Sequence, residues 1–383
     1  MNQEKLNKIR VFVAKYKDAD LHSLLLKKSP FPEVSMQELV QQIKGRKIAE
    51  KKFPFLNKDN IIFPPNLNLE QASSQDTAEF KAQFFKGKKF LDLTCGFGID
   101  AYFLSQNFEE ITLIEQNTEL LEIVKNNWEV LDRKANFINQ QLEDFLESNQ
   151  EKFDLIYLDP ARRDNQNRKV FLLEDLSPNI IEIQEQLSDI STEILIKLSP
   201  LIDIQHLVSS LKNIYKIWII AVKNDVKEVL VYLKKTENQP EISCINLQST
   251  EPEFHFNLDD EKHCQSEFSI PKKYIYIPNN SVLKSGAFNL VSEKFGLRKL
   301  HQNTHIYTSE EKIEHFPGRI FETEEINSKA IKKGEQFNII TKNFPLKPEE
   351  IKKKYKIKDG GNQYLIAVKS LSGNHFLVGK LLD

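Results

Sequence analysis

The sequence contains little cysteine and no long apolar segment, and each absence excludes a class of protein. Only three cysteines occur among 383 residues, so no disulfide framework is indicated. No apolar run approaches the ~18 residues that a membrane-spanning helix requires, and the first residues lack the apolar core of a signal peptide. We therefore expect a cytoplasmic protein without a membrane partner. Its hydrophobic content of 40% is sufficient for large cores.

Histidine is also too scattered to indicate a metal site. His301, His305 and His315 stand at no metal-ligand spacing with any of the three cysteines. We therefore expect no bound metal. No feature of the sequence indicates an oligomeric state.

The net charge is close to zero, but the charge is distributed unevenly along the chain. The formal charge is −2. Residues 1–60 contain 13 Lys and Arg against 7 Asp and Glu, and residues 331–383 contain 11 Lys against 5 acidic residues. Both ends are therefore positive and the middle is negative. This asymmetry favours contact of the terminal regions with a polyanion such as a nucleic acid. The alternative is that these lysines line solvated helix faces.

Residues 90–100 carry the strongest signal for a ligand site. Apolar residues lead into Asp92, a turn with two glycines follows, and an amphipathic stretch begins after the turn. This order predicts a buried parallel strand whose end turns sharply into a helix. Gly96 and Gly98 would let the backbone approach a ligand closely, because glycine has no Cβ. In an open α/β sheet, such a strand end forms part of the ligand crevice.

Polar residues follow further predicted strands at regular spacing. Residues 111–114 form an apolar strand that ends in Glu115, whose carboxylate is placed to accept hydrogen bonds from two ribose hydroxyls. Residues 136–146 bring polar side chains to the same edge, and residues 153–158 form an apolar strand that ends in Asp159. This alternation predicts a doubly wound α/β sheet. A dinucleotide-binding dehydrogenase is the competing interpretation, but its Gly-x-Gly-x-x-Gly fingerprint is absent.

This series of motifs resembles the class I S-adenosylmethionine-dependent methyltransferases. Residues 92–98, Asp-Leu-Thr-Cys-Gly-Phe-Gly, resemble the first motif of that family, and Glu115 matches its ribose-binding acid. Residues 159–162, Asp-Pro-Ala-Arg, stand where the family has Asp/Asn-Pro-Pro-Tyr/Arg. The resemblance covers roughly residues 85–235. It implies a Rossmann-like, seven-stranded methyltransferase sheet with S-adenosyl-L-methionine as the cofactor.

The resemblance also implies which residues hold the cofactor. Thr94 departs from the family, because it replaces the usual first glycine. Gln141 stands where an acidic residue often binds the adenine amine, so Gln141, Leu142 and Asp144 are all candidates for that contact. The full set of expected cofactor-binding residues is Asp92, Thr94, Cys95, Gly96, Gly98, Asp100, Glu115, Gln116, Gln141, Leu142 and Asp159.

The motif at Asp159 indicates an exocyclic base nitrogen as one possible methyl acceptor. In family members with Asp/Asn-Pro-Pro-Tyr, the first side chain and the adjacent carbonyl orient an amine, a role that Asp159 and Pro160 would take here. Ala161 and Arg162 replace the second proline and the aromatic residue that help to hold a flipped base. No cysteine motif follows Asp159, so covalent attack on pyrimidine C5 is not indicated.

A ribose hydroxyl is the other possible acceptor. Asp159, Lys197 and Glu228 occur in the order of the Lys-Asp-Lys-Glu set of ribose 2′-O-methyltransferases. The first Lys of that set has no clear match, although lysines at 86, 88 and 89 precede the first strand. A lysine within an apolar strand requires a reason, because an unpaired buried ammonium is costly. The alternative is that Lys197 pairs with Asp159 or Glu228 as structural support.

Three arginines, Arg162, Arg163 and Arg168, follow Asp159 closely. Arginine binds phosphate in a bidentate manner, so this cluster favours phosphate contact beside the acceptor. The alternative is that these arginines form salt bridges with neighbouring acidic residues.

Changes of pattern along the chain predict four regions. They are a helical extension (1–70), the methyltransferase domain (71–236), a small α+β, ferredoxin-like module (237–316) and a basic module (317–383). The last of these resembles the THUMP-like domain of a group of bacterial class I methyltransferases, on the basis of residues 343–350 and 358–361. THUMP domains are generally linked to RNA binding, so the resemblance implies an RNA substrate.

Local signals predict individual elements within these regions. Ser35 is expected to cap a helix, and a capping box at Ser73–Asp76 is expected to begin a helix that continues to about Phe85. A single helix is expected near residues 281–295. A turn at Gly360–Gly361 is expected before two short strands.

The sequence as a whole predicts a methyltransferase that uses S-adenosyl-L-methionine and acts on rRNA or tRNA, with a base nitrogen favoured over the ribose 2′-oxygen. In this interpretation Asp159 orients the acceptor, and Arg162, Lys197 and Glu228 support it. One alternative is a methyltransferase of a protein or a small molecule. Another is a non-catalytic protein that binds S-adenosyl-L-methionine and RNA.

Overall fold

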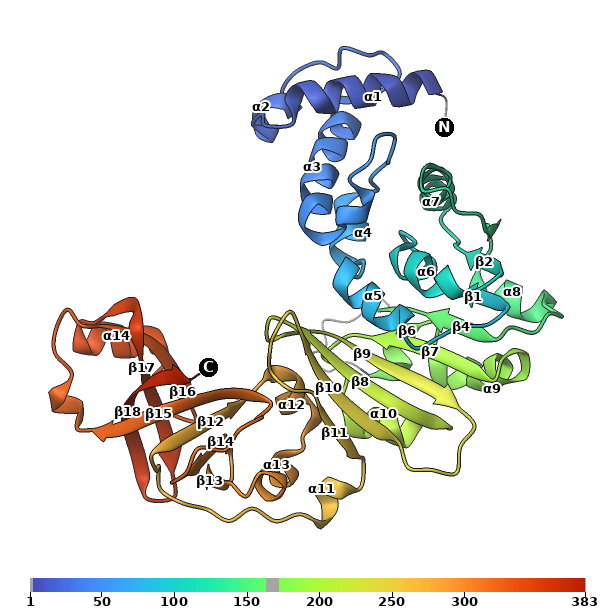
Figure 1. The fold of residues 1–383 in the computed structure, drawn as a ribbon. Helices are drawn as coiled ribbons and strands as arrows, with labels where there is room; N and C mark the ends of the chain where they lie inside the picture. Colours follow the sequence, from blue (N-terminus) through green and yellow to red (C-terminus); the bar gives the residue numbers. More distant parts are fainter. Residues whose placement is uncertain (1–2, 163–171, 383) are drawn as a thin grey trace. The chain divides into compact units, whose positions relative to one another are not determined.

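The structure is a computed structural model, which describes residues 3–162 and 172–382 (Figure 1). The described residues form two compact units. The first unit lies within residues 1–214 and 231–235, and the second contains residues 215–230 and those from Thr236 onward. The division into four regions remains a prediction.

The first unit consists of helices around a parallel sheet. Its described helices are α1 (Gln3–Tyr16), α2 (Leu21–Leu25), α3 (Met36–Lys52), α4 (Asn66–Gln71), α5 (Gln75–Ala82), α6 (Ile99–Leu104), α7 (Thr118–Val130), α8 (Leu142–Ser148), α9 (Ile180–Ile190) and α10 (Ile204–Ser210), with short 3-10 turns at η1 (Pro54–Leu56), η2 (Ser105–Asn107) and η3 (Leu173–Asp175). Its strands are β1 (Lys89–Asp92), β2 (Glu110–Ile114), β3 (Asn136–Ile138), β4 (Leu155–Leu158), β7 (Glu193–Leu198) and the short pair β5 (Ala161–Arg162) and β6 (Leu176–Ser177).

The central strands of the first unit run in the order β7-β4-β1-β2-β3, and the end of β9 (Asp225–Lys234) lies beside β7. All four pairings among these five strands are parallel. Every residue of β4 is buried, as expected of a strand covered on both faces. The parallel direction places the carboxyl ends of the strands at one edge, where Asp92 ends β1 and where Glu115 and Asp159 directly follow β2 and β4. The predicted doubly wound α/β fold is confirmed.

The N-terminal helices form two small cores. Residues of α1, α2 and α3 share one of them, and Figure 1 shows α1 lying across one end of α3. The other core joins the end of α3 to the helix that follows β1, through Phe53, Phe63 and Phe97. Ser35 caps α3 in a full capping box with Glu38, as predicted.

The start of α5 differs from the prediction by one residue. The N-cap is Ser74, whose hydroxyl accepts the N–H of Thr77, and not Ser73. The hydroxyl of Ser73 instead donates to the carboxylate of Asp100 at 2.7 Å. The hydroxyl of Ser73, which the local sequence pattern predicted to cap the helix, therefore forms its hydrogen bond with a residue distant in the sequence. The helix also ends earlier than predicted, at Ala82.

The strands of the second unit belong to two sheets, one of which is the nine-stranded sheet that also contains β7. The strands of this unit are β8 (Ile214–Val222), most of β9, β10 (Glu241–Leu247), β11 (Phe254–Asn257), β12 (Tyr274–Pro278), β13 (Arg298–His301), β14 (Thr304–Ser309), β15 (Gly318–Ile326), β16 (Gln336–Lys342), β17 (Lys358–Ser370) and β18 (Gly373–Leu382). Its described helices are α11 (Asp260–His263), α12 (Asn280–Ser285), α13 (Phe288–Lys294), η4 (Ser328–Ala330) and α14 (Pro348–Tyr355).

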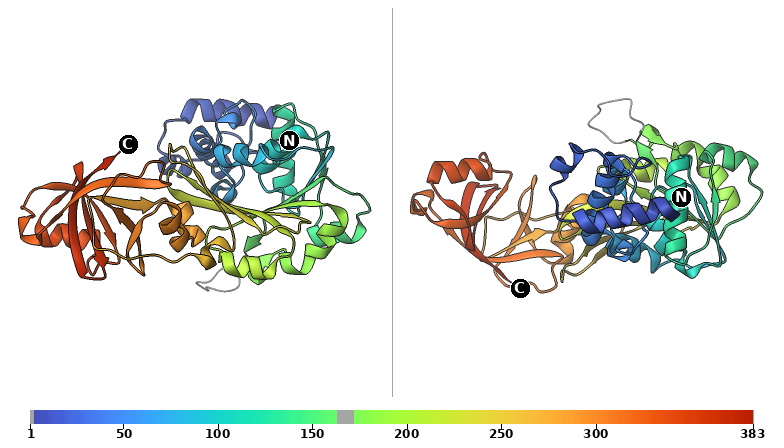
Figure 2. Two further views of the ribbon diagram at one scale, coloured as in Figure 1. Left: turned by 60° about the horizontal axis from the view of Figure 1, so that its bottom comes forward. Right: turned by 90° about the horizontal axis from the view of Figure 1, so that it is seen from above.

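One of these sheets contains β8 to β11, in which β10 pairs in parallel with β8 and antiparallel with β11. The other has the strand order β13-β14-β12-β15-β18-β17-β16. Helix α14 begins at Pro348, whose fixed φ suits the first helical position. Its Ile351 is buried against Phe337 and Leu365, and Figure 2 shows this helix, in red, beside the C-terminal sheet.

Two predictions about the second unit were wrong in detail. The helix expected near residues 281–295 is two helices, because Gly286 adopts φ 78° and ends α12. Gly360 and Gly361 do not form a turn between strands but lie within β17. There Phe337 pairs with Asp359 and the next residue, Asn338, pairs with Tyr364, so β17 bulges at the two glycines.

Candidate active site

The turn after β1 is joined by hydrogen bonds to the end of β4. The hydroxyl of Thr94 accepts the backbone N–H of Asp159 at 2.6 Å. Oδ1 of Asp92 in turn accepts the N–H of Thr94 at 2.8 Å. Asp92 is buried, and this burial raises the pKa of its carboxyl well above the ordinary value. The structure thus brings three predicted site residues, Asp92, Thr94 and Asp159, together at the edge of the sheet.

Glu115 lies against the same turn. Its Oε2 accepts the N–H of Gly96 at 2.9 Å and its Oε1 accepts the N–H of Asn117 at 2.8 Å. Gly96 has φ 55°, and apart from its chain neighbours the nearest described heavy atom to the place of a Cβ is the carbonyl oxygen of Thr94 at 3.7 Å. This side of the turn is therefore open to the approach of a ligand. Burial raises the pKa of the Cys95 thiol well above its ordinary value, which keeps that group protonated.

Gly98 meets a different requirement. Its φ is 74°, and a Cβ there would lie 2.9 Å from Cγ1 of Val124 and 3.1 Å from Nε1 of Trp128. Both of these side chains belong to α7. Close packing against that helix, and not the approach of a ligand, therefore accounts for the absence of a side chain at Gly98.

The residues expected near the adenine lie at the ends of β2 and β3. Gln116 and Gln141 are exposed, whereas Leu142 is buried. Gln141 precedes α8 without a side-chain cap bond. Nδ2 of Asn139 donates to the carbonyls of Glu115 and Gln116 at 2.8 and 3.1 Å and so joins the two loops. The sequence analysis did not identify Asn139.

Asp100 is the centre of a buried polar network. Its Oδ2 accepts hydrogen bonds from the hydroxyls of Ser73 and Tyr157, both at 2.7 Å. The ammonium groups of Lys81 and Lys197 lie 2.9 and 3.3 Å from its carboxylate. Burial raises the pKa of Asp100, but the two lysines outweigh this effect and hold the pKa below its ordinary value. Asp100 was predicted to bind the cofactor, yet its carboxylate already contacts these four protein groups.

Sequence analysis also missed Lys81. The side chain is fully buried and its ammonium donates to the hydroxyl of Ser73 at 3.2 Å. The signal was present in α5, where Thr77, Ala78 and Lys81 occupy one helical stripe, and all three are buried. A lysine on an apolar stripe requires a counter-charge. Lys81 precedes β1 and reaches the same carboxylate as Lys197.

Lys197 connects this network to the acceptor motif. Its ammonium forms an ion pair with Oδ2 of Asp159 and a second one with Asp100. The Lys197 side chain is 9% exposed, whereas that of Asp159 is 36% exposed. Burial raises the pKa of Asp159, and the positive charge of Lys197 offsets part of that increase. Two lysines and two aspartates therefore balance their charges at the end of β4.

The other predicted catalytic residues lie on separate elements. Pro160 is buried directly after Asp159. The backbone of Arg162 pairs with Leu176 in the short β5–β6 ladder. Glu228 is buried in β9 and belongs to the second unit. Arg163 and Arg168 lie outside the described residues.

Within residues 3–162 and 172–382, no three His, Cys, Asp or Glu side chains are grouped as a metal site would require. Over the same ranges, no helix has the length and apolar character of a membrane span.

Three family profiles match parts of the chain. A family described as conserved hypothetical protein 95 matches residues 75–196, which include the turn after β1, β4 and most of β7. A ferredoxin-like domain matches residues 274–317, and a THUMP domain-like family matches residues 318–379. A search of curated proteins found no match.

A solved structure is similar along nearly the whole chain. It is a candidate methyltransferase of Porphyromonas gingivalis W83, with 29% identity, coverage of 99% of both chains and a TM-score of 0.87. An rRNA methylase of Streptococcus thermophilus is 15% identical over 42% of this chain and 95% of its own, with a TM-score of 0.32. A methyltransferase of Pyrococcus furiosus is 16% identical over 52% of this chain and 99% of its own, with a TM-score of 0.38. These last two likenesses are too distant to carry an argument.

Proposed function

The chain belongs to the class I S-adenosylmethionine-dependent methyltransferases, with a THUMP-like domain near its C-terminus, and on this premise we propose that it methylates RNA. The main observation in support of an RNA substrate is a patch of lysines near the C-terminus. Backbone hydrogen bonds from Gly334 to Lys356 and from Lys358 to Glu335 hold two lysine-rich segments side by side. The exposed members of this patch are Lys332, Lys333, Lys353, Lys354, Lys356 and Lys358.

This patch supports contact with a polyanion. None of its lysines forms an ion pair with another described residue, since the acidic neighbours Glu349 and Asp359 are paired with Lys352. Uncompensated exposed lysines attract phosphate and release its counterions on binding. The patch lies within the part of the chain that matches the THUMP-like family.

The residues that hold the cofactor in this proposal line the carboxyl ends of β1 and β2. S-adenosyl-L-methionine supplies an electrophilic methyl group on its sulfonium. The open side of Gly96 leaves room for the backbone of the turn to approach the cofactor. The carboxylate of Glu115, which is fixed by two backbone N–H groups, has further lone pairs for ribose hydroxyls.

We propose a base nitrogen as the acceptor, oriented by Asp159. The ion pair with Lys197 is made through Oδ2 of this carboxylate, and the Asp159 side chain is 36% exposed. Oδ1 can therefore accept a hydrogen bond from an exocyclic amine, which directs the nitrogen lone pair away from the carboxylate. A carboxylate whose pKa is raised is also a better acceptor for the proton that the amine loses after transfer.

One observation favours a ribose hydroxyl as a second candidate. Lys81 and Lys197 both contact Asp100, and Lys197 also contacts Asp159. Two ammonium groups held at one strand end would stabilise the negative charge that develops on a hydroxyl oxygen during deprotonation. The two candidates differ in the atom that is methylated and not in the cofactor.

A comparison of nucleosides tests this proposal. The rRNA and tRNA of cells with and without the gene are digested and analysed by mass spectrometry. Loss of one base-methylated nucleoside is expected, and its return requires an intact Asp159. Loss of a nucleoside methylated on the ribose supports the second candidate. Identical nucleosides in both RNA classes, from cells that express the protein, would contradict an rRNA or tRNA substrate.

A further inference from the structure

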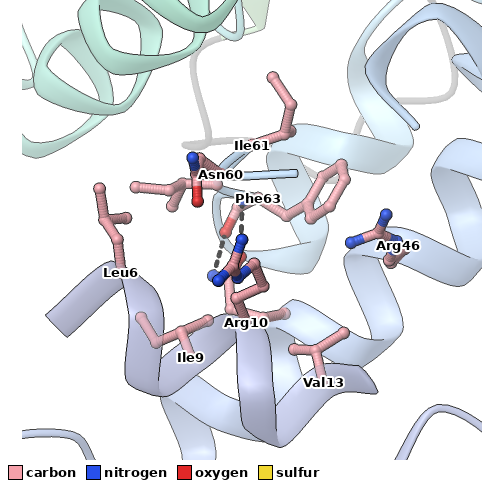
Figure 3. Close-up of a pocket in the computed structure, with 10 residues that line it drawn as sticks. Leu6, Ile9, Arg10, Val13, Arg46, Asn60, Ile61 and Phe63 are labelled. Atoms are coloured by element: carbon pink, nitrogen blue, oxygen red, sulfur yellow. Dashed lines mark hydrogen bonds between the residues drawn. The ribbon is translucent and has the colours of Figure 1, made fainter. Parts of the chain in front are cut away.

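A pocket in the first unit lies between α1, α3 and the segment 60–63 (Figure 3). Its apolar walls include Leu6, Ile9 and Phe63, and the polar side chains that line it are those of Arg10, Gln42, Arg46 and Asn60. The pocket volume is about 20 Å³, which is room for one water-sized group. It is distinct from the strand ends that carry Asp159, since none of the site residues described above lines it.

Two arginines from different helices meet at this pocket. Arg10 is on α1 and Arg46 is on α3, and their side chains are 46% and 30% exposed. The only acidic group near them among the described residues is Asp59, whose carboxylate oxygens lie 3.8 Å from each guanidinium. This distance is too long for hydrogen bonds. The N–H groups of both arginines are therefore free of described protein acceptors.

Asn60 adds a buried acceptor to these two cations. Its Oδ1 is buried and has no hydrogen-bond partner among the described residues. Figure 3 shows this oxygen directed into the pocket, toward the space between Leu6 and Arg10. A buried acceptor without a donor is costly. The space beside it therefore suits a small group that can donate a hydrogen bond, such as a hydroxyl.

The pocket is preorganised by neighbouring helices. The amide of Gln42 on α3 exchanges hydrogen bonds of 2.8 and 2.9 Å with the backbone of Phe63. The amide of Asn127 on α7 exchanges equivalent bonds with the backbone of Ile62. The absence of a side chain at Gly45 lets α3 pack closely on Phe63, because a Cβ there would lie 2.2 Å from the Cβ of Phe63. The segment that carries Asn60 is thus fixed to both the N-terminal helices and the methyltransferase fold.

From these contacts we infer that the pocket binds one ribose-phosphate unit of RNA. The phosphate lies between the guanidiniums of Arg10 and Arg46, where it displaces the distant carboxylate of Asp59. The ribose 2′-hydroxyl enters this small pocket and donates to Oδ1 of Asn60. Arginine suits such a bidentate phosphate contact, and a 2′-hydroxyl contact distinguishes RNA from DNA. The inference rests on the proposed RNA substrate and adds a contact far along the sequence from the C-terminal lysine patch.

Binding of a short fluorescein-labelled RNA, and of DNA of the same sequence, tests this inference by fluorescence anisotropy. The variant R10Q/R46Q should bind RNA more weakly than the wild-type chain, by a factor of up to about ten. A plot of the logarithm of its binding constant against the logarithm of the salt concentration should have a slope that is smaller in magnitude by about 0.7. This is the value expected for the loss of one phosphate contact to a single strand. The matched control K44Q/K47Q removes two positive charges from exposed sites on α3 and should retain most of the affinity.

Two further variants test the individual contacts. D59N removes the competing carboxylate and should increase the affinity for RNA. N60G removes the acceptor but keeps the positive φ of 64° accessible, and it should weaken binding of RNA and not of DNA. Thermal unfolding of each variant verifies that it is folded.

The outcomes separate this inference from the proposed function. If the wild-type chain binds RNA and R10Q/R46Q binds it equally well, the pocket is not an RNA contact although the function stands. If N60G weakens RNA and DNA binding equally, the 2′-hydroxyl contact is refuted. If the wild-type chain binds no RNA at physiological salt, the proposed RNA substrate itself is contradicted.

Discussion

The hydroxyl of Thr94 accepts a hydrogen bond from the backbone nitrogen of Asp159 at 2.6 Å, so the turn after β1 directly supports the end of β4. The resemblance described above implies a glycine at the position of Thr94, and glycine lacks the hydroxyl for this bond. The residue that departs from the family pattern therefore joins the predicted cofactor turn to the acceptor motif. If Asp159 orients the acceptor as proposed, Thr94 acts on the reaction through the position of Asp159.

Replacing Thr94 tests this positioning role. Thr94→Val keeps the shape of the side chain but leaves the N–H of Asp159 without its acceptor, which costs about 1–3 kcal/mol. We expect kcat to fall more than the affinity for S-adenosyl-L-methionine, measured by steady-state kinetics and calorimetry. Thr94→Ser, which retains the hydroxyl, should restore most of kcat. Equal loss in both variants would show that the hydrogen bond is unimportant.

Asp159 is expected to orient the acceptor and not to hold the cofactor. Asp159→Ala should therefore abolish methyl transfer while calorimetry still detects binding of S-adenosyl-L-methionine. Asp189→Ala, at an exposed position on α9, serves as the control and should leave both unchanged. Parallel loss of transfer and cofactor binding in Asp159→Ala would contradict the separate role.

The raised pKa of Asp159 predicts how activity depends on pH. Burial raises this pKa and Lys197 lowers it in part. If the ionised carboxylate is required, kcat/KM falls as the pH decreases through a pKa above the ordinary value of about 3.9. Lys197→Met removes the lowering charge, so the acidic limb should move to higher pH. An unchanged limb in this variant would show that Asp159 does not control the profile.

The buried charge network predicts a large effect of Lys81 on stability. Lys81→Met removes one of the two cations beside Asp100, and breaking a buried ion pair in this way costs roughly 3–5 kcal/mol. Urea denaturation measures the loss in the free energy of unfolding. Lys86→Met changes an exposed lysine nearby and should have little effect. A similar small effect at Lys81 would mean that Asp100 is adequately compensated without it.

The two glycines of the turn should respond differently to a methyl group. Gly98→Ala forces a Cβ to within 2.9 Å of Val124 in addition to the strain of a positive φ, and overpacking of this kind costs about 1–3 kcal/mol. Gly96→Ala carries only the strain of its φ, because no atom lies closer than 3.7 Å. We therefore expect Gly98→Ala to have the lower melting temperature. The reverse order would contradict the packing argument.

The sequence by itself determined the alternation of strands and helices in the first unit. Apolar runs such as residues 111–114 and 153–158 are regular enough to predict strands, and β2 and β4 lie over them. The polar residues after β1, β2 and β4 could be assigned to one edge, because parallel strands place their carboxyl ends together. Pattern and chain direction suffice for these inferences.

Only the tertiary structure decided which side chains meet. The sequence predicted Ser73 as a helix cap, but in the structure its hydroxyl bonds to the carboxylate of Asp100. The sequence analysis assigned no role to Lys81, whose ammonium lies beside the same carboxylate. The pocket at Arg10 and Arg46 likewise joins residues of two separate helices. Local sequence cannot predict such contacts, because they depend on how elements distant along the chain pack and on which buried charges then compensate one another.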